Sequence, residues 1–214
     1  DRFTPGRPWV LTMTAYFSVE ESDAFTEIFN IGAGKAALAM SELLDAPITF
    51  TVPFCIVLPL VEASSYFQRR FGTDVCIISQ DFSGPFDGAA LLMFHEESSF
   101  RLAQAALKSD EPVAAITELE REALTEIGNI ILNACLSSFG DLLEREVATS
   151  LPRYVSGSSG AVFDGARGFD LGLVVKVDFN VEGRDIEGYV TFVLNVDSVA
   201  AFREAASRLL DRLH

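Results

Sequence analysis

The feature that most constrains this chain is a stretch that occurs twice. Residues 23–53 align with residues 122–152 at a constant offset of 99 without a gap, and nine of the aligned pairs are identical. Each copy holds a Glu, an Asn three residues later, and a Pro after twenty-two further residues. A register kept over this length indicates an internal repeat and two similar halves. The identical pairs are Ala24/Ala123, Thr26/Thr125, Glu27/Glu126, Ile28/Ile127, Asn30/Asn129, Ile31/Ile130, Leu43/Leu142, Leu44/Leu143 and Pro53/Pro152.

Both copies begin in a predicted long helix. Ser18 before Glu20 and Glu21 is typical of a helix N-cap, and apolar residues at helical spacing predict a helix over 19–45. The repeat predicts a second helix over 113–146. Strands, a hairpin and a shorter helix follow in each half. The strands are expected at 48–52, 54–60, 75–81, 88–95, 148–154, 171–180 and 185–195, and the shorter helices at 96–109 and 199–213.

This element order predicts an α/β (α+β) fold, in which long and shorter helices pack on a mixed, largely antiparallel sheet. A pseudo-twofold axis is expected to relate the halves. We expect one domain over residues 13–214, made of repeats at about 14–110 and 111–214 and joined by a linker at 110–112.

Residues 1–12 show neither a helical nor a strand period. We expect them to form a tail outside the domain, from upstream or artificially added sequence, with Met13 as the natural start. The alternative is an ordered extra strand at 8–17.

The charge and the cysteines narrow the classes of function. The 214 residues carry 16 Lys and Arg against 31 Asp and Glu, a formal net charge of −15, so a nucleic-acid partner is not expected. No apolar run reaches the roughly 18 residues of a membrane-spanning helix, which predicts a cytoplasmic protein without membrane insertion. Cys55, Cys76 and Cys135 are expected to be buried thiols rather than disulfides or metal ligands.

The polar residues of the repeat would share one helix face, because positions i, i+4 and i+7 project in nearly the same direction. A carboxamide there can hold a water molecule and aim its lone pair without taking its proton. A single Glu-x-x-Asn is an ordinary polar face, but Asn is a poor helix former, and both copies use it without an evident packing role. The candidate residues are Asp23, Glu27, Asn30, Glu122, Glu126 and Asn129.

Two glycines follow the first Asn at positions 32 and 34. Each would cost up to about 1 kcal/mol relative to Ala in a helix interior. Gly32 and Gly34 would allow either an external surface or the facing helix to approach closely.

The doubled spacing Asp/Ser-x3-Glu-x2-Asn-x22-Pro, with Asn-Ile-Gly-Ala-Gly-Lys-Ala-Ala at 30–37, resembles the CheC branch of the CheC/CheX/FliY phosphatases of bacterial chemotaxis. The resemblance covers about residues 14–214. It implies long helices on an extended sheet, and dephosphorylation of a CheY-type response regulator that carries an acyl phosphate on an aspartate. It also implies the deamidase CheD as a partner in some members, no cofactor on this chain, and Mg²⁺ on the regulator.

The resemblance also implies roles for the repeated residues. Asn30 and Asn129 would each orient the attacking water, and Glu27 and Glu126 would each contact the active-site lysine of the regulator. Such a design needs no nucleophile or strong base on this protein, because phosphoryl transfer responds mostly to positioning and charge stabilisation.

The remaining motif positions are less specific. Asp23 and Glu122 are accessory docking groups or simply surface acids, and Pro53 and Pro152 would shape the chain where it enters the sheet. Glu122 departs from the Asp or Ser of the family pattern.

A second departure lies beside the first Asn. Phe29 replaces the Gly that many members have and that this chain has at Gly128. A ring beside Asn30 would either crowd docking or add an apolar contact, which favours the second site.

Two alternatives differ in class. A non-catalytic binding or scaffold module of the same fold would interact with flagellar switch or chemotaxis proteins, although a scaffold has no need of a doubled Glu-x-x-Asn. An independent hydrolase of small phosphates lacks a P-loop, a Cys-x5-Arg motif and clustered histidines, since His95 and His214 are the only two in the chain.

Overall fold

The structure is a computed structural model of the chain. The linker at 110–112, the tail at 1–12 and the alternative strand at 8–17 lie outside the residues it describes. Those residues are 18–72, 75–84, 87–109, 117–158, 163, 168–181, 183–198, 200–201, 203–204 and 207.

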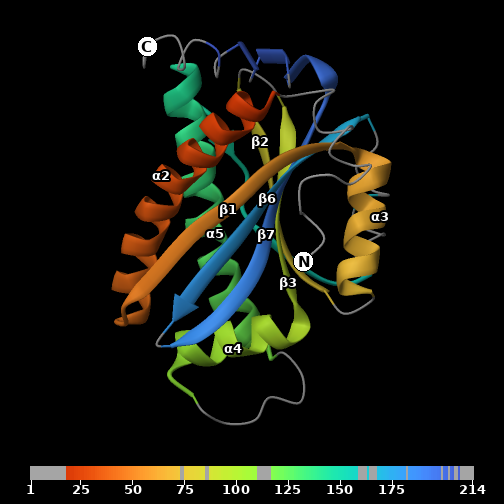
Figure 1. The fold of residues 1–214 in the computed structure, drawn as a ribbon. Coiled ribbons are helices and arrows are strands. Elements are labelled where there is room, and N and C mark those ends of the chain that lie inside the picture. The colour runs from red at the N-terminus through yellow and green to blue at the C-terminus, as the bar shows by residue number, and fades with distance from the viewer. Residues whose placement is uncertain are drawn as a thin grey trace.

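A seven-stranded sheet carries the two long helices and α4 on one face and α3 on the other (Figure 1). The described residues between 196 and 207 are helical, where the sequence predicts a helix over 199–213. The helices are α2 (Val19–Leu44), α3 (Leu60–Phe71), α4 (Glu96–Leu107) and α5 (Glu118–Leu143). The strands are β1 (Ile48–Pro59), β2 (Val75–Ser83), β3 (Gly88–His95), β4 (Ala148–Thr149), β5 (Arg153–Gly157), β6 (Leu171–Val181) and β7 (Arg184–Leu194).

The strand order is β1-β6-β7-β3-β2-β4, and β5 also pairs with β2. The first half thus contributes β1, β2 and β3, and the second half β4 to β7. Each half lends its outer strand to the hairpin of the other half. Every strand pairing that the structure describes is antiparallel. The antiparallel part of the predicted sheet is therefore confirmed, while the pseudo-twofold axis stays a prediction with which this order is compatible.

The two long helices begin alike and end alike. Both are 26 residues long and start with a capping box, formed by Ser18 with Glu21 in α2 and by Thr117 with Glu120 in α5. A left-handed residue then ends each helix. The predicted end at residue 146 was wrong because Glu144, with a φ of 52°, stops α5 at Leu143. The predicted start at 113 lies outside the described residues.

Two apolar clusters hold the layers together. The larger lies between the sheet and α2, α4 and α5, and the smaller lies beneath α3. In the larger cluster the Phe29 ring packs edge-on against Phe139, at 4.8 Å between centroids, and is stacked with Phe192 at 5.7 Å. These rings join both long helices to the central strand β7.

The helix α3 was missed from sequence, where the stretch around Arg69 and Arg70 reads as a polar connection. Its buried positions are Ala63, Phe67 and Phe71, four residues apart. This i, i+4 spacing of apolar residues is the pattern of an amphipathic helix, so the sequence carries a signal for α3 that the polar residues around Arg69 obscure.

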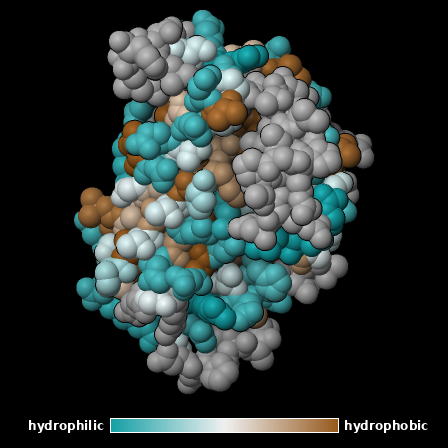
Figure 2. Space-filling model, in the orientation of Figure 1, coloured by the Kyte–Doolittle hydropathy of each residue, from teal (hydrophilic) through white to brown (hydrophobic). Residues whose placement is uncertain are grey.

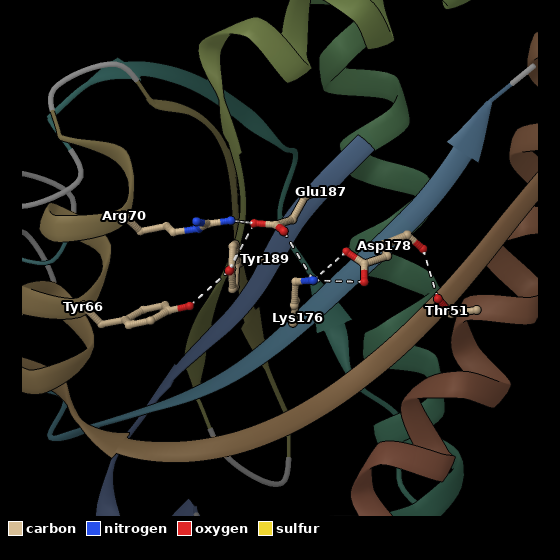
Figure 3. A network of polar contacts seen from close by, with 7 residues as sticks. All are labelled: Thr51, Tyr66, Arg70, Lys176, Asp178, Glu187 and Tyr189. Carbon is tan, nitrogen blue, oxygen red and sulfur yellow. Dashed lines mark hydrogen bonds and ion pairs between the residues drawn. The ribbon is translucent and has the colours of Figure 1, made fainter. Parts of the chain in front are cut away.

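A polar network also ties α3 to the sheet (Figure 3). Arg70 forms an ion pair with Glu187, and the hydroxyl of Tyr66 donates to that of Tyr189 at 3.0 Å. Lys176 lies 3.3 Å from Glu187. Partial burial opposes ionisation of Glu187, but Arg70 and Lys176 outweigh it and lower the pKa of its carboxyl.

The three cysteines are free and buried, as predicted. Burial raises the pKa of Cys76 and Cys135 to about 12, so both remain protonated thiols. The described residues contain no cluster of three or more His, Cys, Asp or Glu suited to a metal ion. Within the same residues, no helix combines the length and apolarity needed to cross a membrane.

Candidate functional site

The repeated acids and amides lie at different depths on their helices. The amides Asn30 and Asn129 are half-buried at the boundary between helix and sheet. All four repeated acids, Asp23, Glu27, Glu122 and Glu126, are exposed. Each helix therefore presents a solvent-facing carboxylate one turn before a partly enclosed carboxamide.

The two motifs form two separate sites. The helices α2 and α5 run in opposite directions side by side (Figure 1). Phe29, next to Asn30, contacts Phe139, which lies ten residues beyond Asn129 on α5. Ten residues correspond to about 15 Å of helix rise, so the two amides cannot act on one reacting group.

The carboxamide of Asn30 is bonded to the backbone of β1 on both sides. Its Oδ1 accepts from the Val52 N–H at 2.9 Å, and its Nδ2 donates to the Val52 carbonyl at 3.3 Å. Val52 and Pro53 form a bulge in the pairing of β1 with β6, between Thr51 and Phe54. A bulged residue loses its ladder partners, and Asn30 replaces them. The expectation that this Asn has no packing role was wrong.

The carboxamide of Asn129 is held by side chains instead. Its Oδ1 accepts from Asn133 Nδ2 at 2.7 Å, one turn further along α5. The Oδ1 of Asn133 accepts from Gln80 Nε2 on β2 at 3.3 Å, and the same Nε2 donates to the carbonyl of Ser150 at 2.8 Å. Sequence reasoning missed both residues: Asn133 lies in the repeat but aligns with Gly34, so it is not among the identical pairs, and Gln80 lies outside both copies.

The second half has a matching bulge that Asn129 does not reach. Leu151 and Pro152 stand between the pairs Thr149/Phe82 and Arg153/Ser79, where Ser150 bonds to Asp81. Leu151 occupies the position of Val52 but is 86% exposed, whereas Val52 is 4% exposed. The chain therefore turns outward here, and Gln80 bonds the carbonyl just before it.

The residue before each Asn faces the core. Phe29 is fully buried, so it neither crowds a docking partner nor offers it a contact, and that expectation was wrong. At Gly128 an added Cβ would lie 2.6 Å from Ile78 of β2. The first half fills this position with a ring, and the second half brings the helix closer to the sheet.

The two glycines of α2 have different surroundings. An added Cβ at Gly32 would lie 2.6 Å from Ser138 Oγ and 3.1 Å from the Ala134 carbonyl, both on α5, which supports the facing-helix alternative. An added Cβ at Gly34 meets nothing within 4 Å.

Apolar side chains flank the first motif on the exposed side of α2. Ile31 and Leu38 are both more than half exposed. Seen from the side of Figure 1, the surface of the described residues is largely hydrophilic with scattered hydrophobic spots (Figure 2). The surroundings of the motif thus offer carboxylates and single apolar contacts.

Known proteins are similar to this chain in sequence. Residues 76–168 match the family described as "Chemotaxis phosphatase CheX". The CheY-P phosphatase CheC of Bacillus subtilis is 30% identical over 149 residues, which cover 67% of this chain and 69% of that protein. The chain belongs to the CheC-type chemotaxis phosphatase family. The predicted resemblance to the CheC/CheX/FliY phosphatases is thereby confirmed.

Solved structures share the fold of this CheC-type chain. FliY from Thermotoga maritima superposes with a TM-score of 0.67 at 19% identity, over 90% of this chain and 98% of that one. The middle domain of FliM from Vibrio alginolyticus gives 0.63 at 15% identity, over 85% and 99%. The predicted combination of helices and an antiparallel sheet is the fold of these proteins.

Proposed function

We propose that this protein hydrolyses the aspartyl phosphate of a CheY-type response regulator in chemotaxis signalling. The proposal rests on its family and on one structural observation. On each long helix an exposed Glu precedes by three residues a carboxamide whose orientation is fixed by hydrogen bonds. This arrangement suits a helix that inserts a Glu and an Asn side chain into the active site of another protein.

In this mechanism the water oxygen attacks phosphorus in line, the bond from phosphorus to the aspartate oxygen breaks, and the water proton leaves with inorganic phosphate. Glu27 and Glu126 contact the lysine of the regulator, and the carboxamides orient the water. Asn30 retains one N–H and one oxygen lone pair after bonding Val52, and Asn129 retains both N–H groups and one lone pair. Fixed positioning of this kind is a main source of acceleration in phosphoryl transfer.

The remaining roles follow from the same docking. Asp23 and Glu122 are accessory docking groups, and any Mg²⁺ belongs to the regulator rather than to this chain. CheD as a further partner stays a prediction.

A second candidate function is a non-catalytic scaffold for flagellar switch or chemotaxis proteins. The likeness to the FliM middle domain favours it. A scaffold would bind its partner without shortening the lifetime of the phosphate.

The test is the lifetime of the phosphorylated regulator with wild-type protein and with Asn30→Ala, Asn129→Ala and the double variant. We expect each single variant to lose part of the acceleration and the double variant to lose about 100-fold. Circular dichroism at the assay temperature checks that each variant is folded.

Two matched variants of α2 separate docking from general surface charge. Glu27→Ala should weaken binding of the regulator, whereas Glu42→Ala, an exposed acid outside the motif, should not. Equal acceleration by the wild type and a folded double Asn variant would contradict the mechanism, and binding without turnover would support the scaffold.

A further inference from the structure

The two carboxamides are held by different means, and this difference leads to an inference that rests on the proposed function. We propose that Asn133 and Gln80 are positioning residues that fix the carboxamide of Asn129 for the reaction. They replace, in the second half, the backbone bonds that Val52 supplies to Asn30 in the first half.

The direction of the chain of amides is set by a group that can only accept. The carbonyl of Ser150 accepts from Gln80, so the Nε2 of Gln80 must point toward it. That same Nε2 donates to Asn133 Oδ1, which leaves Asn133 Nδ2 to donate to Asn129 Oδ1. The Nδ2 of Asn129 bonds to no other described residue and is left for solvent or a docked phosphoryl group.

The hydrogen-bonded amides occur in the second half, where Asn129 lacks the backbone bonds that Asn30 makes with Val52. Asn133 aligns with Gly34 in the repeat, and Gly34 has no side chain to reach Asn30. Gln80 is the single residue opposite the bulge at Leu151 and Pro152, and Val177 is the single residue opposite the bulge at Val52 and Pro53. The first half therefore has no counterpart of the Asn133 or Gln80 amide, and it needs none because Val52 holds Asn30.

Gln80 is also buried at a position whose counterpart in the first half is the apolar Val177. It is 1% exposed, and its Oε1 has no hydrogen-bond partner in the structure. A buried acceptor without a partner is destabilising, and Val177 shows that the sheet accepts an aliphatic side chain at the matching position. A polar group kept at such a cost indicates a functional use.

The experiment uses a Glu27→Ala parent, in which docking at the first site is weakened without removing the bonds of Asn30. In this parent we introduce Asn133→Ala, Gln80→Val and, as a control, Ser137→Ala on the exposed side of the same helix. We expect Asn133→Ala to lower kcat for the phosphorylated regulator about tenfold with KM unchanged, the loss of one hydrogen bond. Gln80→Val should lower kcat by a smaller factor, and Ser137→Ala should leave it unchanged.

A second measurement does not depend on activity. The side-chain amide of Asn129, followed by ¹⁵N relaxation, should be rigid in the wild type, with an order parameter of about 0.8, and should fall below about 0.6 in Asn133→Ala. Ser137→Ala should not change it.

The outcomes separate the two claims. A wild type without any effect on the regulator phosphate would contradict the proposed function, while the Asn129 amide signal would still decide whether Asn133 holds it. Unchanged kcat in both Asn133→Ala and Gln80→Val, or an Asn129 amide already mobile in the wild type, would overturn the positioning role.

Discussion

The two halves carry the same Glu-x-x-Asn and the same bulge at a proline, yet they join these features differently. In the first half Asn30 closes the bulge by bonding Val52, whereas in the second half Leu151 turns outward and Asn129 bonds along its own helix. The comparison teaches that identity of sequence between repeats does not carry over to identity of contacts. The carboxamide of Asn30 bonds the sheet directly, whereas that of Asn129 does not.

The comparison also explains the interval between Asn and Pro in the first half. A spacing of twenty-two residues brings Asn30 beside the residue before Pro53, where the strand needs a donor and an acceptor. In the second half the same interval persists although Gln80 bonds the strand instead.

The largest expected effect concerns the residues before the two amides. Phe29→Ala should lower the free energy of unfolding by about 3–5 kcal/mol, because it empties a fully buried ring site between Phe139 and Phe192. Gly128→Ala should cost about 1–2 kcal/mol, because its Cβ would press on Ile78. Urea unfolding of both variants measures these free energies. Equal losses of stability would contradict the view that the two halves pack this position differently.

A smaller difference is expected between the amides themselves. Asn30→Ala should destabilise by about 2 kcal/mol, since it leaves the Val52 N–H and carbonyl without partners at a partly buried bulge. Asn129→Ala should change stability by less than about 0.5 kcal/mol, because Ala is the better helix former and one half-exposed bond is lost. Thermal unfolding distinguishes the two, and a more damaging Asn129→Ala would reverse our assignment of the structural amide.

The smallest expected effect tests a contact between the halves on the opposite face of the sheet. Glu187 of β7 has a lowered pKa beside Arg70 of α3, so its contribution to stability is present above its ordinary value of 4.5 and is lost as the pH falls through the lower folded value. The pair is partly exposed, so this contribution should stay below about 1 kcal/mol. Glu187→Gln should therefore be less stable than the wild type at pH 7, and the difference should shrink as the pH falls below 4.5; a difference in urea unfolding that stays constant across this range would exclude the ionic contribution.

Much of the fold was predictable from sequence because its elements carry strong local signals. The local sequence indicates the capping box at Ser18 and the apolar spacing of the long helices. It also indicates the hairpin whose strands end at Val181 and begin at Arg184. Helix α3 also has the i, i+4 apolar spacing of an amphipathic helix, but it was missed because the segment is short and polar around Arg69 and Arg70.

The candidate site was predictable only as far as the repeat reaches. The repeat identifies the acids and amides, but not their partners: Asn30 bonds Val52 of a strand, and Asn129 bonds Asn133, which is not an identical position of the repeat. Gln80 and Val52 are brought to the site by the sheet register, which no local pattern encodes. Their functional use stays a prediction until the variants are measured.

The exchange of outer strands between the halves has one more consequence. Since β1 completes the hairpin of the second half and β5 that of the first, neither half holds a whole sheet of its own. A polypeptide cut between α4 and α5 would leave two interdependent pieces, so separately produced halves should form the sheet only when both are present.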